Sequence, residues 1–158
     1  LIRAPEVFVG ASGDSRVVLG VRHPSDPSRL TSEALSIDHR PSRQAEKNRI
    51  LAFGGRIQPK KNDFGQFVGE ERVWLRDMEM PGLMVTRTIG DEMGTSVGCI
   101  PDPELVRRVI DVKKHKYLVI ASDGVWDVFE SEQILEMINS EKTLKDACKS
   151  VLKACIQA

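Results

Sequence analysis

Apolar residues gather into short runs along the chain, and polar residues, glycine and proline separate these runs. The most pronounced run is Tyr117–Ala121, which ends at Ser122-Asp123-Gly124. Its length and its aromatic and β-branched content favour a buried strand, although periodicity alone leaves a short buried helix open. The turn that follows holds a carboxylate at the end of a rigid strand. Asp127 lies four residues further on and shares a face with Asp123 if a helical turn begins there.

Other β-rich runs predict further strands. Glu6–Ala11 and Arg16–Val21 flank a Gly-, Asp- and Ser-rich turn that carries Asp14, which is the pattern of a β-hairpin. Strands are also predicted at Leu30–Ser36 and Leu105–Ile110. Lys113-Lys114-His115-Lys116 is expected to be a solvated hairpin connection from the latter strand to Tyr117. Leu83–Ile89 suits either a strand or the start of a buried helix, and it ends at Gly90-Asp91.

Three segments have helical features. The first runs from Ser42, which is expected to be its N-cap, to about Leu51. Two more follow the Tyr117–Ala121 strand, with Ser131 and Thr143 as predicted caps. The apolar stripe of the last helix needs a partner surface, so it is predicted to be core.

Residues 58 to 82 are rich in loop-forming residues and form the least regular part of the sequence. A loop of this length inside a compact domain is usually functional or mobile. Arg72–Leu75 is expected to be a short strand within it. Trp74 is expected to anchor this segment on the body of the domain.

Composition places the chain among ordinary globular domains. Its 158 residues are enough for one domain with a real core, and 41% of them are hydrophobic. Basic and acidic residues are equal in number, which argues against a nucleic-acid or membrane-surface partner. No apolar run approaches the roughly 18 residues of a membrane span. The three cysteines lack zinc-type spacing and are expected to be reduced and mostly buried, in a cytoplasmic or nuclear protein.

Acidic residues recur at turns beside apolar runs, at Asp14, Asp91 and Asp123. Carboxylate oxygens are the ligands that Mg2+ and Mn2+ prefer, so converging aspartates would form a metal site. The alternative is a set of solvated turn residues, and at Asp14 the local sequence alone favours that alternative. His39, a lone histidine close to a proline, is more simply structural than a ligand.

Four segments, taken in this order, resemble the metal-dependent protein serine/threonine phosphatases of type 2C. They are Gly13-Asp14-Ser15-Arg16; Asp38-His39-Arg40-Pro41 with Glu46, Arg49-Ile50 and Gly54-Gly55; Thr86-Arg87-Thr88-Ile89-Gly90-Asp91; and Ala121-Ser122-Asp123-Gly124-Val125-Trp126-Asp127-Val128. The resemblance implies an α+β fold that is part of a four-layer α-β-β-α sandwich with antiparallel sheets. It also implies that residues 58–82 include a flap-like insertion beside the catalytic cleft.

The same resemblance implies a site and a reaction. The family holds two Mg2+ or Mn2+ ions and has a weaker third metal site, and a metal-bridging water attacks the phosphate of phosphorylated protein substrates. By motif match, Asp123 is a direct metal ligand and Asp127 acts through metal-bound water. Asp14 matches a residue of the third site. Asp91 matches a position near the cleft, where it either binds metal or holds the turn, so Asp123 and Asp91 are the catalytic candidates.

Some motifs of the family are missing from the sequence. The Asp-Gly-His-Gly-Gly motif that supplies the metal-bridging aspartate does not occur, nor does the family's late Asp-Asn. Residues 1–158 are therefore expected to be the carboxyl-terminal half of a catalytic domain. By itself this fragment is expected to have little or no turnover and to self-associate through exposed sheet edges. The alternative function is that of a catalytically inactive, phosphatase-like scaffold or binding module.

Overall fold

The computed structural model describes residues 1–3 and 5–158, and the chain divides into two compact units. Unit 1 contains residues 1–11, 15–37 and 104–158, and unit 2 contains residues 12–14 and 38–103. Both units combine helices with sheets whose named strands pair antiparallel, which confirms the predicted α+β class. None of the helices in the described residues is both long enough and apolar enough to cross a bilayer.

Unit 1 holds two three-stranded sheets. The first has the order β1-β2-β8, with β1 at Ile2–Arg3, β2 at Glu6–Ala11 and β8 at Glu104–Val109. The second has the order β4-β3-β9, with β4 at Asp26–Ala34, β3 at Arg16–His23 and β9 at His115–Ala121. The strand predicted at Tyr117–Ala121 is therefore confirmed.

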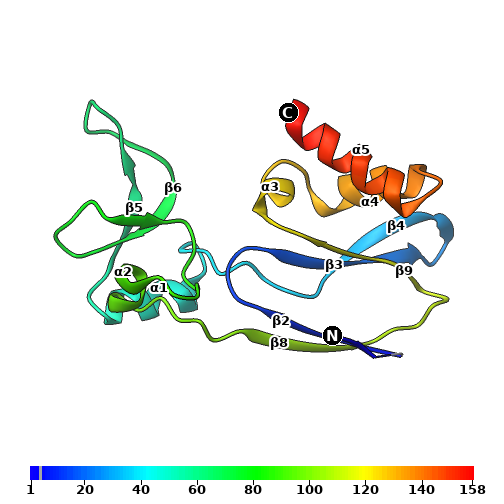
Figure 1. Ribbon diagram of the computed structural model, residues 1–158, viewed down its shortest axis with the longest axis horizontal. Helices are drawn as coiled ribbons and strands as arrows, with labels where there is room; N and C mark the ends of the chain where they lie inside the picture. The colour runs from blue at the N-terminus through cyan, green and yellow to red at the C-terminus, as the bar shows by residue number, and fades with distance from the viewer. Residues whose placement is uncertain (4) are drawn as a thin grey trace. The chain divides into compact units, whose positions relative to one another are not determined.

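The two sheets of unit 1 pack face to face, and helices cover the outer face of the second sheet (Figure 1). The alternation of side chains along β3 explains both contacts. Leu19 packs toward β2, against Val7 and Val9, whereas its neighbour Val18 packs toward the helices, against Ile134. These layers correspond to three of the four expected in the sandwich, and the fourth stays a prediction.

The helices of unit 1 are α3 (Asp123–Trp126), α4 (Ser131–Ser140) and α5 (Leu144–Gln157). Thr143 caps α5 as predicted, because its hydroxyl oxygen accepts a hydrogen bond from the Asp146 N–H at 3.1 Å. The cap predicted at Ser131 is wrong by one residue. Glu130 is the N-cap of α4, and it forms a capping box with Gln133.

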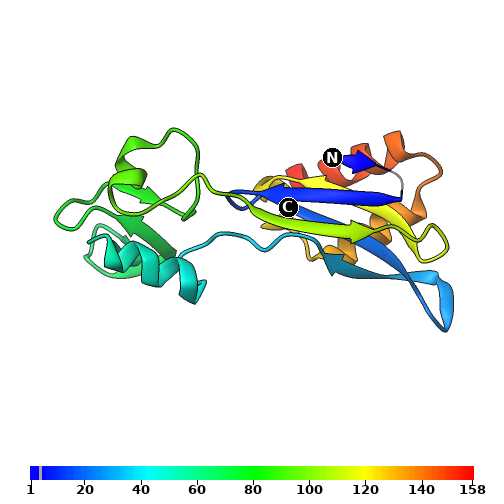
Figure 2. The same cartoon turned by 90° about the horizontal axis from the view of Figure 1, so that it is seen from below.

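The predicted hairpin between Glu6–Ala11 and Arg16–Val21 is wrong, although both segments are strands. β2 pairs with β1 and β8, whereas β3 pairs with β4 and β9. The turn between them thus carries the chain from one sheet to the other (Figure 1), whereas β2 and β8 lie side by side in the first sheet (Figure 2). The hairpin connection predicted at Lys113–Lys116 is wrong as well, because it leads from β8 in the first sheet to β9 in the second, and His115 already belongs to β9. A turn sequence specifies a reversal of the chain, but it does not specify whether the two strands share a ladder.

Unit 2 is built on a three-stranded sheet of order β5-β6-β7. Its elements are α1 (Gln44–Ala52), β5 (Arg56–Lys61), β6 (Phe67–Trp74), β7 (Pro81–Leu83) and α2 (Glu92–Ser96). Ile50 of α1 packs against Val73 of β6, together with Val97 and Cys99.

Three sequence predictions about unit 2 need correction. Residues 58–82 are mostly sheet rather than irregular loop, because β5 and β6 carry polar, exposed residues that hide the alternation of a strand. Leu83–Ile89, for which a strand and the start of a buried helix were both open, is neither beyond Leu83, where β7 ends. The N-cap of α1 is Arg43, not Ser42, and no side chain caps this helix.

Candidate functional site

Asp123 stands at the point where β9 turns into α3. Ser122 is still extended, and Asp123 is the first residue of the helical turn. The Asp123 Oδ1 accepts a hydrogen bond from the Gly124 N–H at 2.8 Å. The buried indole of Trp126 donates to the Ala121 carbonyl oxygen at 2.8 Å, which ties the helical turn to the end of the strand. The backbone that carries Asp123 is therefore held firmly.

Asp127 ends the same turn. Its N–H donates to the Asp123 carbonyl oxygen at 2.8 Å, so the helical turn on which their shared face depends is present. Asp123 and Asp127 are both exposed. Two exposed carboxylates one helical turn apart offer the oxygen donors that a hydrated divalent cation prefers. The donor set within unit 1 therefore fits Mg2+ or Mn2+.

Asp14 belongs to unit 2 and is an ion-paired residue rather than a solvated turn aspartate. Its Oδ2 lies 3.5 Å from Nη2 of Arg40. The same guanidinium lies 3.6 Å from Oδ2 of Asp38 and 3.1 Å from Oε2 of Glu70. The structure thus brings Asp14 together with Asp38 around one arginine.

Asp91 is the N-cap of α2 in unit 2. Its Oδ1 accepts a hydrogen bond from the Gly94 N–H at 2.8 Å, and its carbonyl oxygen accepts one from the Thr95 hydroxyl at 2.7 Å. Asp91 thus holds the α2 turn, and its role in binding metal stays a prediction.

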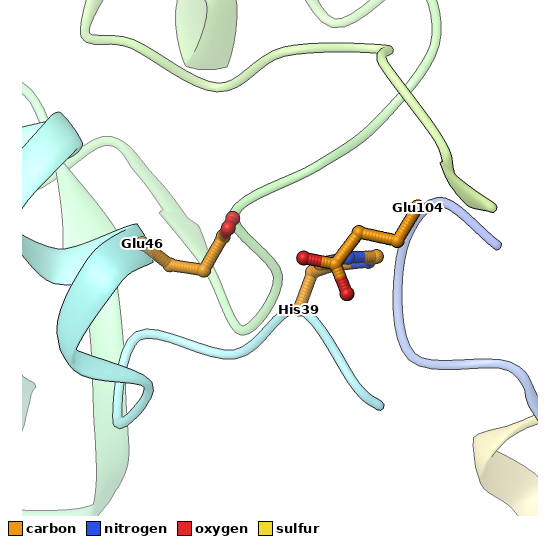
Figure 3. A group of neighbouring side chains, drawn as sticks. All are labelled: His39, Glu46 and Glu104. Atoms are coloured by element: carbon orange, nitrogen blue, oxygen red, sulfur yellow. The ribbon is translucent and has the colours of Figure 1, made fainter. Parts of the chain in front are cut away.

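A buried carboxylate network in unit 2 has no counterpart in the sequence prediction. Glu46 of α1 is 1% exposed. Its carboxylate accepts hydrogen bonds from Arg49 Nη2, Arg87 Nη2 and the Thr86 hydroxyl, each at 2.7 Å. Figure 3 shows the Glu46 side chain projecting from its helix. The network joins two of the family-like segments, because Glu46 comes from one of them and Thr86-Arg87 from another.

The charge of Glu46 follows from these partners. Burial alone would raise the pKa of its carboxyl group. The hydrogen bonds from Arg87, Arg49 and Thr86 outweigh burial and hold the pKa of Glu46 well below its ordinary range. Glu46 is therefore ionised and neutralised by two arginines, which is the arrangement of a structural ion pair.

His39 extends this network through the backbone. The histidine is fully buried, and its Nδ1 lies 3.2 Å from the Gly13 backbone nitrogen. The His39 carbonyl oxygen accepts hydrogen bonds from the Thr86 N–H at 2.7 Å and the Thr86 hydroxyl at 2.9 Å. This geometry agrees with the structural role predicted for His39.

The sequence carried one signal of this network. Glu46 and Arg49 are spaced i, i+3 on a helix, which allows an ion pair. Neither the burial of the pair nor the arrival of Arg87 from a distant segment is visible in that spacing.

Comparisons with known proteins agree with these motifs. The model of the protein phosphatase 2C family matches residues 1–158. The chain is 33% identical to probable protein phosphatase 2C 73 of Arabidopsis thaliana over 159 residues, which cover 100% of this chain and 41% of the relative. It is 34% identical to probable protein phosphatase 2C 12 of Oryza sativa subsp. japonica over 152 residues, which cover 96% of this chain and 37% of the relative.

The fold is also similar to that of solved structures. A crystal structure of serine-threonine phosphatase 2C from Toxoplasma gondii matches with a TM-score of 0.81 and 23% identity, covering 97% of this chain and 49% of that one. A sex determining protein of C. elegans matches with a TM-score of 0.71 and 21% identity, covering 97% of this chain and 34% of that one. The chain thus spans less than half the length of each of these proteins.

Proposed function

This chain belongs to the protein phosphatase 2C family, and from that membership we propose that the protein containing it hydrolyses phosphoserine and phosphothreonine in phosphorylated proteins. The reaction depends on Mg2+ or Mn2+, with two ions in the complete domain and a weaker third. The observation that supports this function best is the pairing of Asp123 with Asp127 on one helical turn, within a family match that spans the whole chain.

The aspartates have separate roles in this proposal. Bound divalent ions lower the pKa of water and neutralise phosphoryl oxygens, which supplies the nucleophile at neutral pH. Asp123 is a direct ligand on a rigid strand end, and Asp127 holds metal-bound water. Asp14 serves the third ion, where Arg40 competes for its carboxylate. Asp91 acts at the cleft by holding the α2 turn.

Metal binding can be tested on this chain by calorimetric titration with Mn2+. Asp127→Asn is expected to weaken binding by about tenfold, as changes to outer partners of a metal site commonly do, and Asp123→Asn is expected to weaken it further. Glu136→Gln is the matched control, because it removes one exposed negative charge from α4 of the same unit. Equal affinities for all four proteins would refute the assignment of these ligands.

Activity is tested separately with p-nitrophenyl phosphate and Mn2+. The 158-residue chain alone is expected to show little or no turnover, because the Asp-Gly-His-Gly-Gly motif is absent from it. Clear turnover that Asp123→Asn abolishes would refute this expectation. The longer polypeptide that contains the chain is expected to be active, and an inactive one would refute the proposed hydrolysis.

The second candidate is a catalytically inactive, phosphatase-like scaffold or binding module. The coding sequence on either side of the chain separates the two functions. An upstream Asp-Gly-His-Gly-Gly and a downstream Asp-Asn support the enzyme, and a flanking sequence without them supports the scaffold.

Self-association of the chain is a further part of the proposal. Within the described residues, β9 pairs only with β3, so one edge of β9 has no neighbouring strand. A groove of about 430 Å³ lies along β9 and α5, and Ile120 of this strand is 68% exposed. Unpaired edges with apolar side chains favour pairing with another chain. Sedimentation that shows only monomer at every concentration would contradict this.

A cytoplasmic or nuclear location is proposed for the protein. All three cysteines are free thiols, which are typical of a reducing compartment, but the prediction that they are mostly buried is wrong, since only Cys99 is buried. Imaging of a fluorescent fusion in cells tests this, and secretion of the fusion would contradict it.

A further inference from the structure

A basic pocket opens on the sheet of unit 2. Its volume is about 600 Å³, and its walls include the ends of β5, β6 and β7. Lys60, Lys61 and Arg72 contribute three cationic side chains to the wall. Glu79 contributes one carboxylate, whose Oε1 accepts a hydrogen bond from Arg56 at 3.1 Å. The charge that faces the pocket is therefore positive, although the chain as a whole has a net charge of zero.

The floor of the pocket is fixed. Trp74 is 5% exposed, and its indole N–H donates to the Gln58 carbonyl oxygen at 2.8 Å. Gly82 lies directly against the indole, since a Cβ on this residue would lie 2.8 Å from the ring. Arg72 is held in place as well, because its Nη1 donates to the Gly82 carbonyl oxygen at 2.8 Å. The two lysines are exposed, and Lys61 Nζ lies 5.5 Å from the centroid of the Phe67 ring.

We propose that this basic pocket binds an acidic peptide segment of a protein partner. Three cations arranged around a flat aromatic and glycine floor suit a chain that presents carboxylates on an extended backbone. A nucleic acid needs a longer basic stripe than two lysines and one arginine. A pocket with a rigid floor also suits a peptide better than a lipid surface, which presents a broad plane of charge. The inference concerns binding alone and is independent of the proposed hydrolysis.

The test uses this chain and a short fluorescent peptide rich in glutamate, with binding followed by fluorescence anisotropy. The double variant Lys60→Gln/Lys61→Gln is expected to bind about fivefold more weakly, if each lysine contributes about 0.5 kcal/mol as exposed ion pairs do. Lys113→Gln/Lys114→Gln is the matched control, because it neutralises two adjacent exposed lysines at the turn of unit 1. This control is expected to bind as the unchanged chain does.

A second variant changes affinity in the opposite direction, which a folding defect does not do. Glu79→Gln removes the carboxylate from the wall and is expected to tighten binding about twofold. Circular dichroism of each variant confirms that its fold is intact.

Four other outcomes would refute the inference. Equal weakening by both lysine pairs would show diffuse attraction rather than a pocket. Competition by inorganic phosphate as effective as that by the unlabelled peptide would show a simple anion site. Binding to phosphatidylserine vesicles but not to the peptide would show a lipid surface. Binding of a glutamine version of the peptide with equal affinity would remove the role of charge.

Discussion

Glu46→Gln is the most informative perturbation of unit 2, because it removes the charge of the buried carboxylate and keeps its shape. The wild-type side chain accepts hydrogen bonds from Arg49, Arg87 and Thr86 at 2.7 Å. A glutamine keeps one oxygen acceptor and turns two N–H donors toward groups that are themselves donors. The variant therefore leaves two guanidinium groups without their counter-charge.

The expected cost is about 3 kcal/mol in the free energy of unfolding. Removing one partner of a buried ion pair typically costs about 3–5 kcal/mol. The lower end applies here because both arginines keep other acceptors. Arg49 donates to the carbonyl oxygens of Gly98 and Thr86 at 2.8 Å, and Arg87 donates to that of Asp102 at 2.7 Å. Their side chains are also 19% and 12% exposed, so water compensates part of the loss.

The difference in the free energy of unfolding between the wild type and Glu46→Gln is expected to shrink in acid. The pKa of Glu46 is lowered in the folded state, so its contribution is fully present above its unfolded value of about 4.3. As the pH falls below that value, the unfolded chain takes up a proton that the folded chain does not. The free energy of unfolding of the wild type then falls by about 1.4 kcal/mol per pH unit relative to that of the variant.

Urea denaturation at about pH 5 and about pH 3 measures both effects. A Trp126→Phe background leaves Trp74 as the reporter of unit 2, since the chain has two tryptophans. Glu71→Gln is the matched control, because Glu71 forms a partly exposed ion pair with Lys47 at 2.6 Å. Such a pair contributes less than about 1 kcal/mol to the free energy of unfolding. Equal losses for Glu46→Gln and Glu71→Gln, or a Glu46 difference that does not change with pH, would refute the reasoning.

Two further predictions concern unit 2. Gly82→Ala is expected to lower the free energy of unfolding by about 3 kcal/mol, because φ is +75° and the new Cβ would lie 2.8 Å from the Trp74 ring. Gly65→Ala has the same φ but open space around it, so it is expected to lower that free energy by about 1 kcal/mol. Equal urea midpoints for the two variants would contradict this. Burial, with a smaller effect of nearby charge, raises the pKa of the Cys99 thiol to about 11, so a thiol reagent at pH 8 is expected to modify exposed Cys148 and spare Cys99 until urea unfolds the chain. Mass spectrometry of the modified peptides checks this, and rapid labelling of Cys99 in the folded chain would contradict it.

The strands of unit 1 could be predicted because their apolar, β-branched runs record burial directly. Tyr117–Ala121 lies within β9, and Glu6–Ala11 coincides with β2. Their partners could not be predicted, because pairing depends on which strand edges meet in three dimensions. The β5–β6 hairpin was not predicted, because its strands lack such apolar runs. Seven of the fourteen residues in its strands carry charged or amide side chains, so loop-forming residues such as Gly65 and Gly69 dominated the local pattern.

The candidate site shows the same division. The helical turn of Asp123 and Asp127 was predictable, because a strand end followed by Asp-Gly and a fourth-residue carboxylate is a purely local pattern. The burial of Glu46 was not, because a glutamate in the first turn of a helix is adequately explained by the helix dipole. Only the contact with Arg87, 41 residues away in the sequence, shows that this glutamate is structural.

The exposure of a carboxylate and the partners it already has therefore distinguish the structural carboxylates from the candidate metal ligands. Glu46 already faces two guanidinium groups at 2.7 Å, and a divalent cation brought to it would be repelled by both. Asp14 shares Arg40 with two other acids, and one oxygen of Asp91 is engaged by a helix cap. Asp123 is exposed and accepts a hydrogen bond only from its neighbour's N–H among the interactions resolved in unit 1. Loss of metal affinity should consequently be larger for Asp123→Asn than for Asp14→Asn, and the reverse order would place the principal cation beside Arg40.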